Sequence, residues 1–416
     1  MSFYDMTVEK YASLPLHTLT LRQMLAQGEE ALKDPNFMVR NARFVHKEMP
    51  VRLAKRLMDL QFLPHIVVIN PHIKQVYDSY RQAFDMLTAF PEIKTLEDNA
   101  KFTQMITMLV DDHTPLCWEC WRGESGSALS AAACAAAPTF SSFGASLSVS
   151  DSVCAHQLVD DHTPLLGVLA RGVRECALRP LVGRELDLDP FLDNMLRSRI
   201  SRRVIAEHHI CLQHQRPGFI GVICSQLSMR TLVEAATKQC TDVSRRTFGF
   251  CPDFEMHGDV DSTFAYVPAH IEYMLFEILK NASRAVVEHH LKKAHEEGKS
   301  ISQATFPPVT ITVCRGQKES TIKVSDQGGG IANELKEKVW SYGFSSLDED
   351  TEAIQPAGPL DSHGSPMAGL GFGLPLSRLH AQYFGGDIEF FSIPGYGTDV
   401  YIRVHRLGDH QEEFEI

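Results

Sequence analysis

Three segments in a particular order constrain this chain more than any other feature of its sequence. The first is a predicted helix over residues 268–290, where Glu277 and Asn281 stand four apart and share one face beside an apolar stripe. The second, 322–331, is a predicted strand that runs into an aspartate and three glycines. The third, 369–378, is a glycine-rich turn that opens a helix. A polar line beside an apolar stripe is usually only a solvated face, but the three segments together indicate one site.

Their order resembles the ATP-binding fold shared by histidine kinases, type II topoisomerases, heat-shock chaperone ATPases, mismatch-repair ATPases and mitochondrial protein kinases. The residue types suit that chemistry. The oxygen of Asn281 can hold Mg²⁺ against the triphosphate, Asp326 can accept a hydrogen bond from the adenine amino group, and Glu277 can accept a proton from an attacking hydroxyl. Glycines let backbone N–H groups approach phosphates, and the helix start after Gly373 favours negative charge. The candidate nucleotide-binding residues are Asn281, Arg284, Asp326, Gly328, Gly330, Gly369, Leu370, Gly371, Phe372, Gly373 and Leu374; Glu277 and Lys280 are catalytic candidates.

Composition limits the other possibilities. The chain has 416 residues, enough for two or three domains. A formal net charge of −12 argues against a general nucleic-acid binder, and no run of about 18 apolar residues predicts a membrane span. The ten cysteines show no regular framework, which favours a reducing compartment over a disulfide scaffold. The N-terminal residues carry acids early and do not resemble a transit peptide.

The chain divides into a helical half and a mixed half. Residues 17–225 are predicted to form an antiparallel helical bundle, and Pro50 is expected to break one helix or to occupy its first turn. Residues 226–416 alternate helices and strands, as in an α/β sandwich, with a polar lid at about 345–368 over the nucleotide. The fold class is therefore α+β. A first bundle helix is expected to begin at 20–25, and others at 38–60, 70–90, 96–110, 166–176 and 189–211. A further helix is expected at 227–240, and strands at 264–267, 309–313, 321–324, 387–392 and 398–404.

One stretch does not fit this pattern. Residues 109–116 recur letter for letter as 158–165, and the segment between them is rich in alanine and serine without helical or strand periodicity. A repeat architecture would need at least three copies. We interpret 117–165 as an insertion or an unspliced segment that carries a duplicated edge. A functional loop rich in cysteine and tryptophan is the alternative, and the pair Cys117-x-x-Cys120 has no second matching pair that would indicate a metal site.

With both halves in view, the chain resembles the mitochondrial protein kinases that phosphorylate 2-oxoacid dehydrogenase complexes. The resemblance rests on residues 50–54 (Pro-Val-Arg-Leu-Ala), 198–203 (Ser-Arg-Ile-Ser-Arg-Arg), 397–401 (Gly-Thr-Asp-Val-Tyr) and the three nucleotide segments. Within that family it is more similar to the branched-chain type than to the pyruvate type. The segments 158–162, 216–224 and 412–416 carry this preference, as does Tyr273, where the pyruvate type has histidine.

The resemblance implies an ATP-dependent serine kinase in the mitochondrial matrix. It would phosphorylate and inactivate the E1 alpha subunit of the branched-chain 2-oxoacid dehydrogenase complex, bind the lipoyl-bearing E2 core and form a homodimer. It also implies ATP, Mg²⁺ and K⁺ as cofactors. By the same resemblance, His162 would face the catalytic helix, Ser345, Ser346 and Thr398 would lie near the nucleotide, and Val339, Ser341 and Phe344 would hold the potassium ion, although Ser341 replaces an aspartate of the mammalian pattern.

Three other functions stay open on the sequence alone. A pyruvate dehydrogenase kinase would use the same site on a different E1. A two-component histidine kinase would phosphorylate a histidine of its own bundle, but neither His113 nor His162 is flanked by a Glu-Pro pair, and no receiver-like or sensor domain is present. A non-catalytic ATP-binding module is disfavoured because Glu277, Asn281 and Asp326 are all present.

Overall fold

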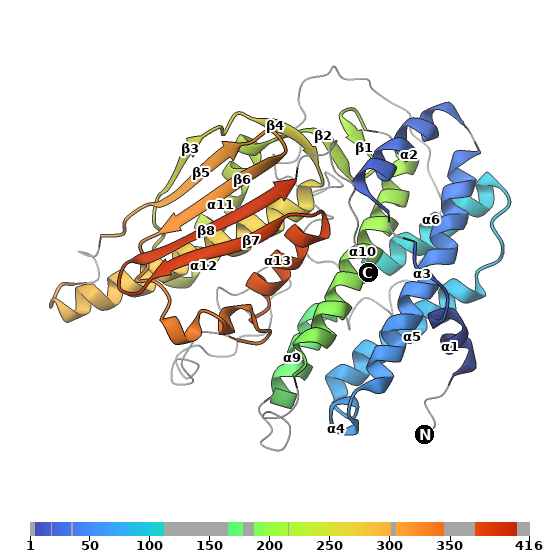
Figure 1. Ribbon diagram of the computed structural model, residues 1–416, viewed down its shortest axis with the longest axis horizontal. Coiled ribbons are helices and arrows are strands. Elements are labelled where there is room, and N and C mark those ends of the chain that lie inside the picture. Colours follow the sequence, from blue (N-terminus) through green and yellow to red (C-terminus); the bar gives the residue numbers. More distant parts are fainter. Residues whose placement is uncertain are drawn as a thin grey trace, which may run out of the picture.

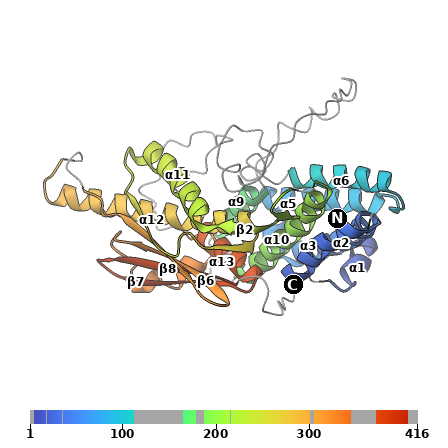
Figure 2. The ribbon, with the colours of Figure 1, turned by 90° about the horizontal axis from the view of Figure 1, so that it is seen from above.

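The computed structural model describes residues 5–17, 19–34, 36–111, 165–177, 187–214, 216–300, 305–344 and 371–405. It has an α+β architecture, as predicted. Figure 1 shows the two parts side by side, with helices of the first half of the chain on one side and a sheet backed by helices on the other. Figure 2, from above, places α11 and α12 on the same side of this sheet. No helix in the described part of the chain is long and apolar enough to span a membrane.

The first part is a bundle whose helices begin where the sequence provides capping residues. The Thr20 hydroxyl accepts a hydrogen bond from the backbone N–H of Gln23, and the side-chain oxygen of Gln23 accepts one from the backbone N–H of Thr20. Asn70 caps the helix that starts at Pro71. The bundle helices are α1 (Met6–Ala12), α2 (Leu21–Lys33), α3 (Phe37–Phe62), α4 (His65–Val68), α5 (Pro71–Ala89), α6 (Leu96–Asp111), α9 (Leu165–Ala177) and α10 (Asp189–Gln213).

The prediction for Pro50 was wrong, because α3 runs through this residue without a break. Residues next to Pro50 in α3 make contacts with other parts of the bundle. Arg52, 2% exposed, donates from Nη1 to Oγ of Ser201 at 2.7 Å and from Nη2 to the carbonyl oxygen of His17 at 2.5 Å. Leu53 of the same segment packs in the hydrophobic core, and Val51 is also buried. These tertiary contacts compensate for the missing backbone donor of Pro50, a cost of about 3 kcal/mol.

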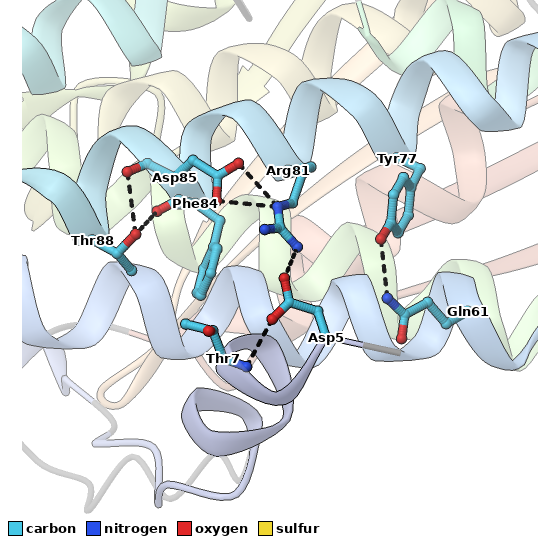
Figure 3. A network of polar contacts seen from close by, with 8 residues as sticks. All are labelled: Asp5, Thr7, Gln61, Tyr77, Arg81, Phe84, Asp85 and Thr88. Atoms are coloured by element: carbon cyan, nitrogen blue, oxygen red, sulfur yellow. Dashed lines mark hydrogen bonds and ion pairs between the residues drawn. The ribbon is translucent and has the colours of Figure 1, made fainter. Parts of the chain in front are cut away.

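Polar contacts fasten the bundle's first helix, which the sequence analysis did not predict. Figure 3 shows Arg81 of α5 between two carboxylates, Asp85 of its own helix and Asp5, the N-cap of α1. Asp5 in turn accepts a hydrogen bond from the backbone N–H of Thr7 at 2.7 Å. The hydrogen bond to Arg81 is the largest of the effects that lower the pKa of Asp5. The short α1 is thus tied to α5 by a charged contact as well as by packing.

The second part contains two sheets. A small one joins β1 (Phe219–Ile220), β2 (Ile223–Ser228) and β4 (Thr263–Tyr266) in antiparallel pairs. The larger sheet has the order β3-β5-β6-β8-β7, in which only β3 and β5 are parallel. Its strands are β3 (Phe254–Gly258), β5 (Val309–Arg315), β6 (Glu319–Asp326), β7 (Asp387–Ile393) and β8 (Gly397–His405).

Helices cover one face of the larger sheet. The helix α12 (Pro268–Glu296) contacts β5, β6 and β8, while α13 (Gly373–Tyr383) contacts β7 and β8. Alternate residues of β6 are buried, as expected for a strand that packs one face on helices. The helix α11 (Met229–Phe248) packs on α12 as its partner. The core of this part therefore lies between α12, α13 and the sheet.

Two sequence predictions need adjustment here. The helix expected at 227–240 begins at Met229, because Leu227 belongs to β2 and Ser228 caps the helix, and it continues to Phe248. The expected domain boundary at 225/226 falls inside β2, whose strand partners come from both sides of it, so that boundary stays a prediction. The proposed insertion up to residue 164 and the proposed lid at 345–368 lie outside the described residues.

Candidate active site

The predicted catalytic helix α12 is buried on more sides than an amphipathic helix requires. Every residue from Met274 to Lys280 is buried, including Glu277 at 8% and Lys280 at 2% exposure. A buried charge needs a partner, and Nζ of Lys280 lies 2.8 Å from Oε1 of Glu277. The helix therefore carries a preformed ion pair, and Glu277 does not belong to a solvated face.

Glu277 also lies against the start of α13. A Cβ atom added to Gly373 would lie 2.1 Å from Oε2 of Glu277. A larger residue at this helix start would displace the carboxylate from this position. Two of the three predicted segments, far apart in the sequence, are thus in direct contact at the proposed base.

Asn281 and Arg284 continue along α12 toward solvent. Asn281 is exposed, so its amide oxygen is accessible to a cation. Arg284 is half-buried, and its Nε donates to Oε1 of Glu288 at 2.7 Å. One face of the helix therefore passes from a buried carboxylate through an open amide to a guanidinium that already has an acidic partner.

Asp326 ends β6 as predicted, and its surroundings oppose its negative charge. The side chain is 9% exposed, and burial raises its pKa to about 6. The backbone N–H of Gly328, 2.8 Å from Oδ1, and the backbone N–H of Thr398 offset only part of this effect. A buried carboxylate held mainly by backbone donors retains accepting capacity for a ligand's amino group.

The glycines after Asp326 permit close approaches between elements. A Cβ atom on Gly328 would lie 2.5 Å from Cβ of Ala285 on α12. Gly330 has a φ of +68°, and a side chain there would meet the carbonyl oxygen of Ile393. These residues therefore set the distance between the end of β6, α12 and the β7–β8 turn.

Thr398 pairs with Asp326 across β6 and β8. Its hydroxyl lies 3.0 Å from that of Ser392, which also accepts from the backbone N–H of Ile331 at 2.7 Å. In the structure the Thr398 side chain belongs to this internal network, and its backbone faces Asp326.

The residues Gly371, Phe372 and Gly373 are the described part of the glycine-rich turn and are called the glycine segment below. Gly371 has a φ of +75°, a backbone conformation that favours glycine. Phe372 is buried at 5% exposure, and the half-buried Leu374 follows in the first turn of α13. No side chain caps this helix start at Phe372, and the first backbone N–H groups of a helix favour an anion.

The candidate potassium residues Val339, Ser341 and Phe344 lie within one short loop after η2 (Asn333–Leu335), which includes η3 (Lys338–Trp340). Among the described residues, no group of three or more His, Cys, Asp or Glu side chains is arranged to hold a metal ion. Potassium would therefore depend on carbonyl and hydroxyl oxygens of this loop, and its site stays a prediction. The candidates His162, Ser345, Ser346, Gly369 and Leu370 lie outside the described residues.

The structure adds a contact that the sequence analysis missed. Tyr342 lies in a loop beside the glycine segment, and its hydroxyl donates to Oδ1 of Asp193 on α10 at 2.6 Å. The two residues are far apart in the chain, so no local pattern could pair them. The site is therefore connected to the bundle.

Comparison with known families agrees with both halves of the fold. Residues 18–120 and 146–224 match the family described as mitochondrial branched-chain alpha-ketoacid dehydrogenase kinase. Residues 267–407 match the family of histidine kinase-, DNA gyrase B- and HSP90-like ATPases. The matched region includes α12, β6 and the glycine segment.

Similar proteins extend over almost the whole chain. A mitochondrial [pyruvate dehydrogenase (acetyl-transferring)] kinase of Arabidopsis thaliana is 31% identical over 97% of this chain and 94% of its own length. A kinase of the same name from Schizosaccharomyces pombe is 28% identical over 98% of this chain and 97% of its own length. Isozyme 4 of Mus musculus is 28% identical over 98% of this chain and 85% of its own length.

Proposed function

Because this chain belongs to the mitochondrial 2-oxoacid dehydrogenase kinase family, we propose that it transfers phosphate from ATP to a serine of an E1 subunit, with the pyruvate dehydrogenase complex as its target. The chain is a protein kinase with an ATP-binding domain. The observation that best supports the proposed chemistry is the contact of the buried Glu277 carboxylate with the glycine segment. It brings an acceptor for a proton next to a helix start suited to phosphate.

The proposed reaction assigns one task to each group. The serine oxygen attacks the terminal phosphorus of ATP, the bond to the bridging oxygen breaks, ADP leaves, and the serine proton passes to Glu277. Lys280 holds the Glu277 carboxylate in place through their ion pair. Asp326 accepts from the adenine amino group, and the glycine segment donates backbone N–H groups to the phosphates.

Magnesium belongs to this proposal as a partner of the triphosphate. Asn281 would supply an oxygen ligand, because it is exposed one turn beyond Glu277. When bound, the ion neutralises charge on the phosphates. Arg284 lies one turn further along and would need to exchange its contact with Glu288 for one with phosphate.

The choice of substrate follows the relatives. The sequence analysis favoured the branched-chain complex, and the profile that matches the bundle carries that description. The whole-length relatives named above are pyruvate dehydrogenase kinases. Their names support pyruvate E1 as the substrate more strongly than branched-chain E1. We therefore take pyruvate E1 as the first substrate to test and branched-chain E1 as the second.

The same reasoning extends to partners and location. A kinase of E1 would meet its substrate on the lipoyl-bearing E2 core of the complex, in the mitochondrial matrix, and we expect a homodimer as in the family. The relatives' names give a mitochondrial location and a dehydrogenase target for those proteins.

Phosphate transfer from labelled ATP onto purified pyruvate E1 and branched-chain E1, run side by side, tests the proposal. We expect pyruvate E1 to be phosphorylated faster and on serine. Glu277→Gln is the control, because it keeps the shape of the side chain and should slow transfer by roughly a hundredfold while ATP still binds. Faster labelling of branched-chain E1 would reassign the substrate. Acid-labile label on the chain itself would indicate a histidine kinase.

A further inference from the structure

Tyr342 connects the bundle to the nucleotide-binding part. Its hydroxyl donates to Oδ1 of Asp193 at 2.6 Å, and its backbone N–H donates to Oδ1 of Asp189 at 3.3 Å. Asp189 is the first residue of α10, and Asp193 lies one turn later. Two hydrogen bonds from one residue therefore fix this loop to the start of a bundle helix.

The other side of Tyr342 contacts the glycine segment. Its ring packs on that of Phe372, with centroids 5.1 Å apart. The next residue, Gly343, donates its N–H to the carbonyl oxygen of Gly371 at 3.2 Å. A Cβ atom on Gly371 would lie 2.5 Å from the backbone of Gly343 and from that of Phe344. The loop and the glycine segment are thus in backbone contact, so a shift of one displaces the other.

This contact extends to the proposed base. Gly373, next to Phe372, is the residue that lies against Oε2 of Glu277. A continuous series of contacts therefore runs from Asp193 through Tyr342 and Phe372 to Glu277. A second tie between α10 and α13, from Arg197 to Gln382 at 3.0 Å, reaches the opposite end of α13.

The Tyr342 hydroxyl is suited to a permanent tie. Burial and the hydrogen bond to Asp193 raise the pKa of Tyr342. The phenol therefore keeps the proton that it donates to Asp193. A hydrogen bond to a charged acceptor is among the stronger ones in proteins.

We propose that Tyr342 is a positioning residue for phosphoryl transfer: its bond to Asp193 holds the glycine segment in the arrangement that receives the phosphates of ATP. The inference depends on the proposed role of the glycine segment, and it does not depend on which E1 is the substrate. An interface bond that only adds stability is the competing explanation.

Tyr342→Phe tests this directly, because it removes the hydroxyl and keeps the ring on Phe372. We expect the Kd and the KM for ATP to rise about tenfold, with a smaller change in kcat. Tyr77→Phe is the matched control, because it removes another tyrosine hydroxyl that accepts from Gln61 at 3.0 Å inside the bundle (Figure 3). It should change the melting temperature without changing the Kd for ATP.

A double-variant cycle completes the test. If the bond acts as proposed, Tyr342→Phe in an Asp193→Ala background adds little to the effect of Asp193→Ala alone. Fully additive effects on the Kd, or a Tyr342→Phe variant that changes only the melting temperature, would overturn the inference. Direct titration with ATP keeps this result separate from the substrate question, since a chain that binds ATP but labels neither E1 still reports on Tyr342.

Discussion

Gly373 and Glu277 occupy adjoining space, and a single methyl group on the glycine would reach the carboxylate oxygen at 2.1 Å. Gly373 is the first residue of α13 and has no positive φ, so alanine suits its backbone. The obstacle to alanine is the buried, ion-paired side chain of Glu277. The glycine is therefore required by the site and not by the helix.

We expect Gly373→Ala to displace the Glu277 carboxylate and to lower kcat by up to about a hundredfold, since small misplacements of catalytic groups have effects of this size. Gly167→Ala is a suitable control, because this glycine of α9 has open space around its Cβ position. The measurement is the rate of E1 phosphorylation together with the melting temperature. Unchanged turnover in Gly373→Ala would show that Glu277 adjusts freely and that the contact is incidental.

The ion pair between Lys280 and Glu277 leads to a second prediction. Both side chains are buried, so Lys280→Met leaves the carboxylate without its partner, and we expect a loss of about 3–5 kcal/mol in the free energy of unfolding. The double variant Glu277→Gln/Lys280→Met removes both charges and should recover much of this stability without recovering activity. Denaturant unfolding of both variants gives the comparison. A single variant as stable as the wild type would mean that Glu277 finds solvent or another donor.

Asp326 gives a third prediction, on pH. Its pKa in the folded protein is about 6, raised from an ordinary value of 3.8 mainly by burial. A raised pKa means that the folded state prefers the protonated form of Asp326. The protonated side chain therefore adds to the free energy of unfolding below about pH 4, and this contribution is lost as the pH rises through about 6. The loss is about 3 kcal/mol. The side chain of Asp326→Asn cannot ionise. The free energy of unfolding of this variant, relative to that of the wild type, should therefore increase as the pH rises through this window.

ATP binding should change in the opposite direction over the same pH range. The ionised carboxylate is the stronger acceptor for the adenine amino group, so the affinity of the wild type should fall about tenfold as the pH drops below about 6. Asp326→Asn should bind weakly throughout, and its titration corrects for protonation of ATP itself. Parallel pH profiles of the two proteins would exclude Asp326 as the adenine acceptor.

The predictable parts of this site are those with local signals. The spacing of Glu277 and Asn281 and the strand that ends at Asp326 are encoded within a few residues, and the two strands expected at 309–313 and 321–324 are present as the antiparallel pair β5 and β6. The parallel partner strand β3 was missed, because all of α12 separates it from β5 in the chain. Its register depends on contacts that no local pattern records.

The burial of charged residues was equally hard to foresee. No sequence pattern predicted that Arg52 and Lys280 would be buried, yet both are 2% exposed. Each is buried because a partner meets it, Ser201 from α10 for Arg52 and Glu277 for Lys280. The contact between Tyr342 and Asp193 belongs to the same class, since it joins two halves of the chain. Tertiary pairing decides the cases of Arg52 and Tyr342, whereas Lys280 pairs with a residue three positions earlier on its own helix.

The duplicated segment provides the last prediction. The described helices use opposite ends of its two copies, because Val110 of the first copy ends up in the core of α6 and Leu165 of the second in that of α9. Deleting residues 117–165 leaves one copy and places Leu116 directly before Leu166, where Leu165 now stands. We expect this short connection to keep the core contacts of α6 and α9.

We therefore expect the deleted chain to fold, to bind ATP with unchanged affinity and to melt no lower than the full chain, since a shorter connection costs less closure entropy. The interruption of the family match between residues 120 and 146 supports the same expectation. Thermal melting and limited proteolysis of both chains provide the measurement. If the deleted chain melts lower, or if the segment resists protease in the full chain, residues 117–157 are packed structure and the interpretation as an insertion is wrong.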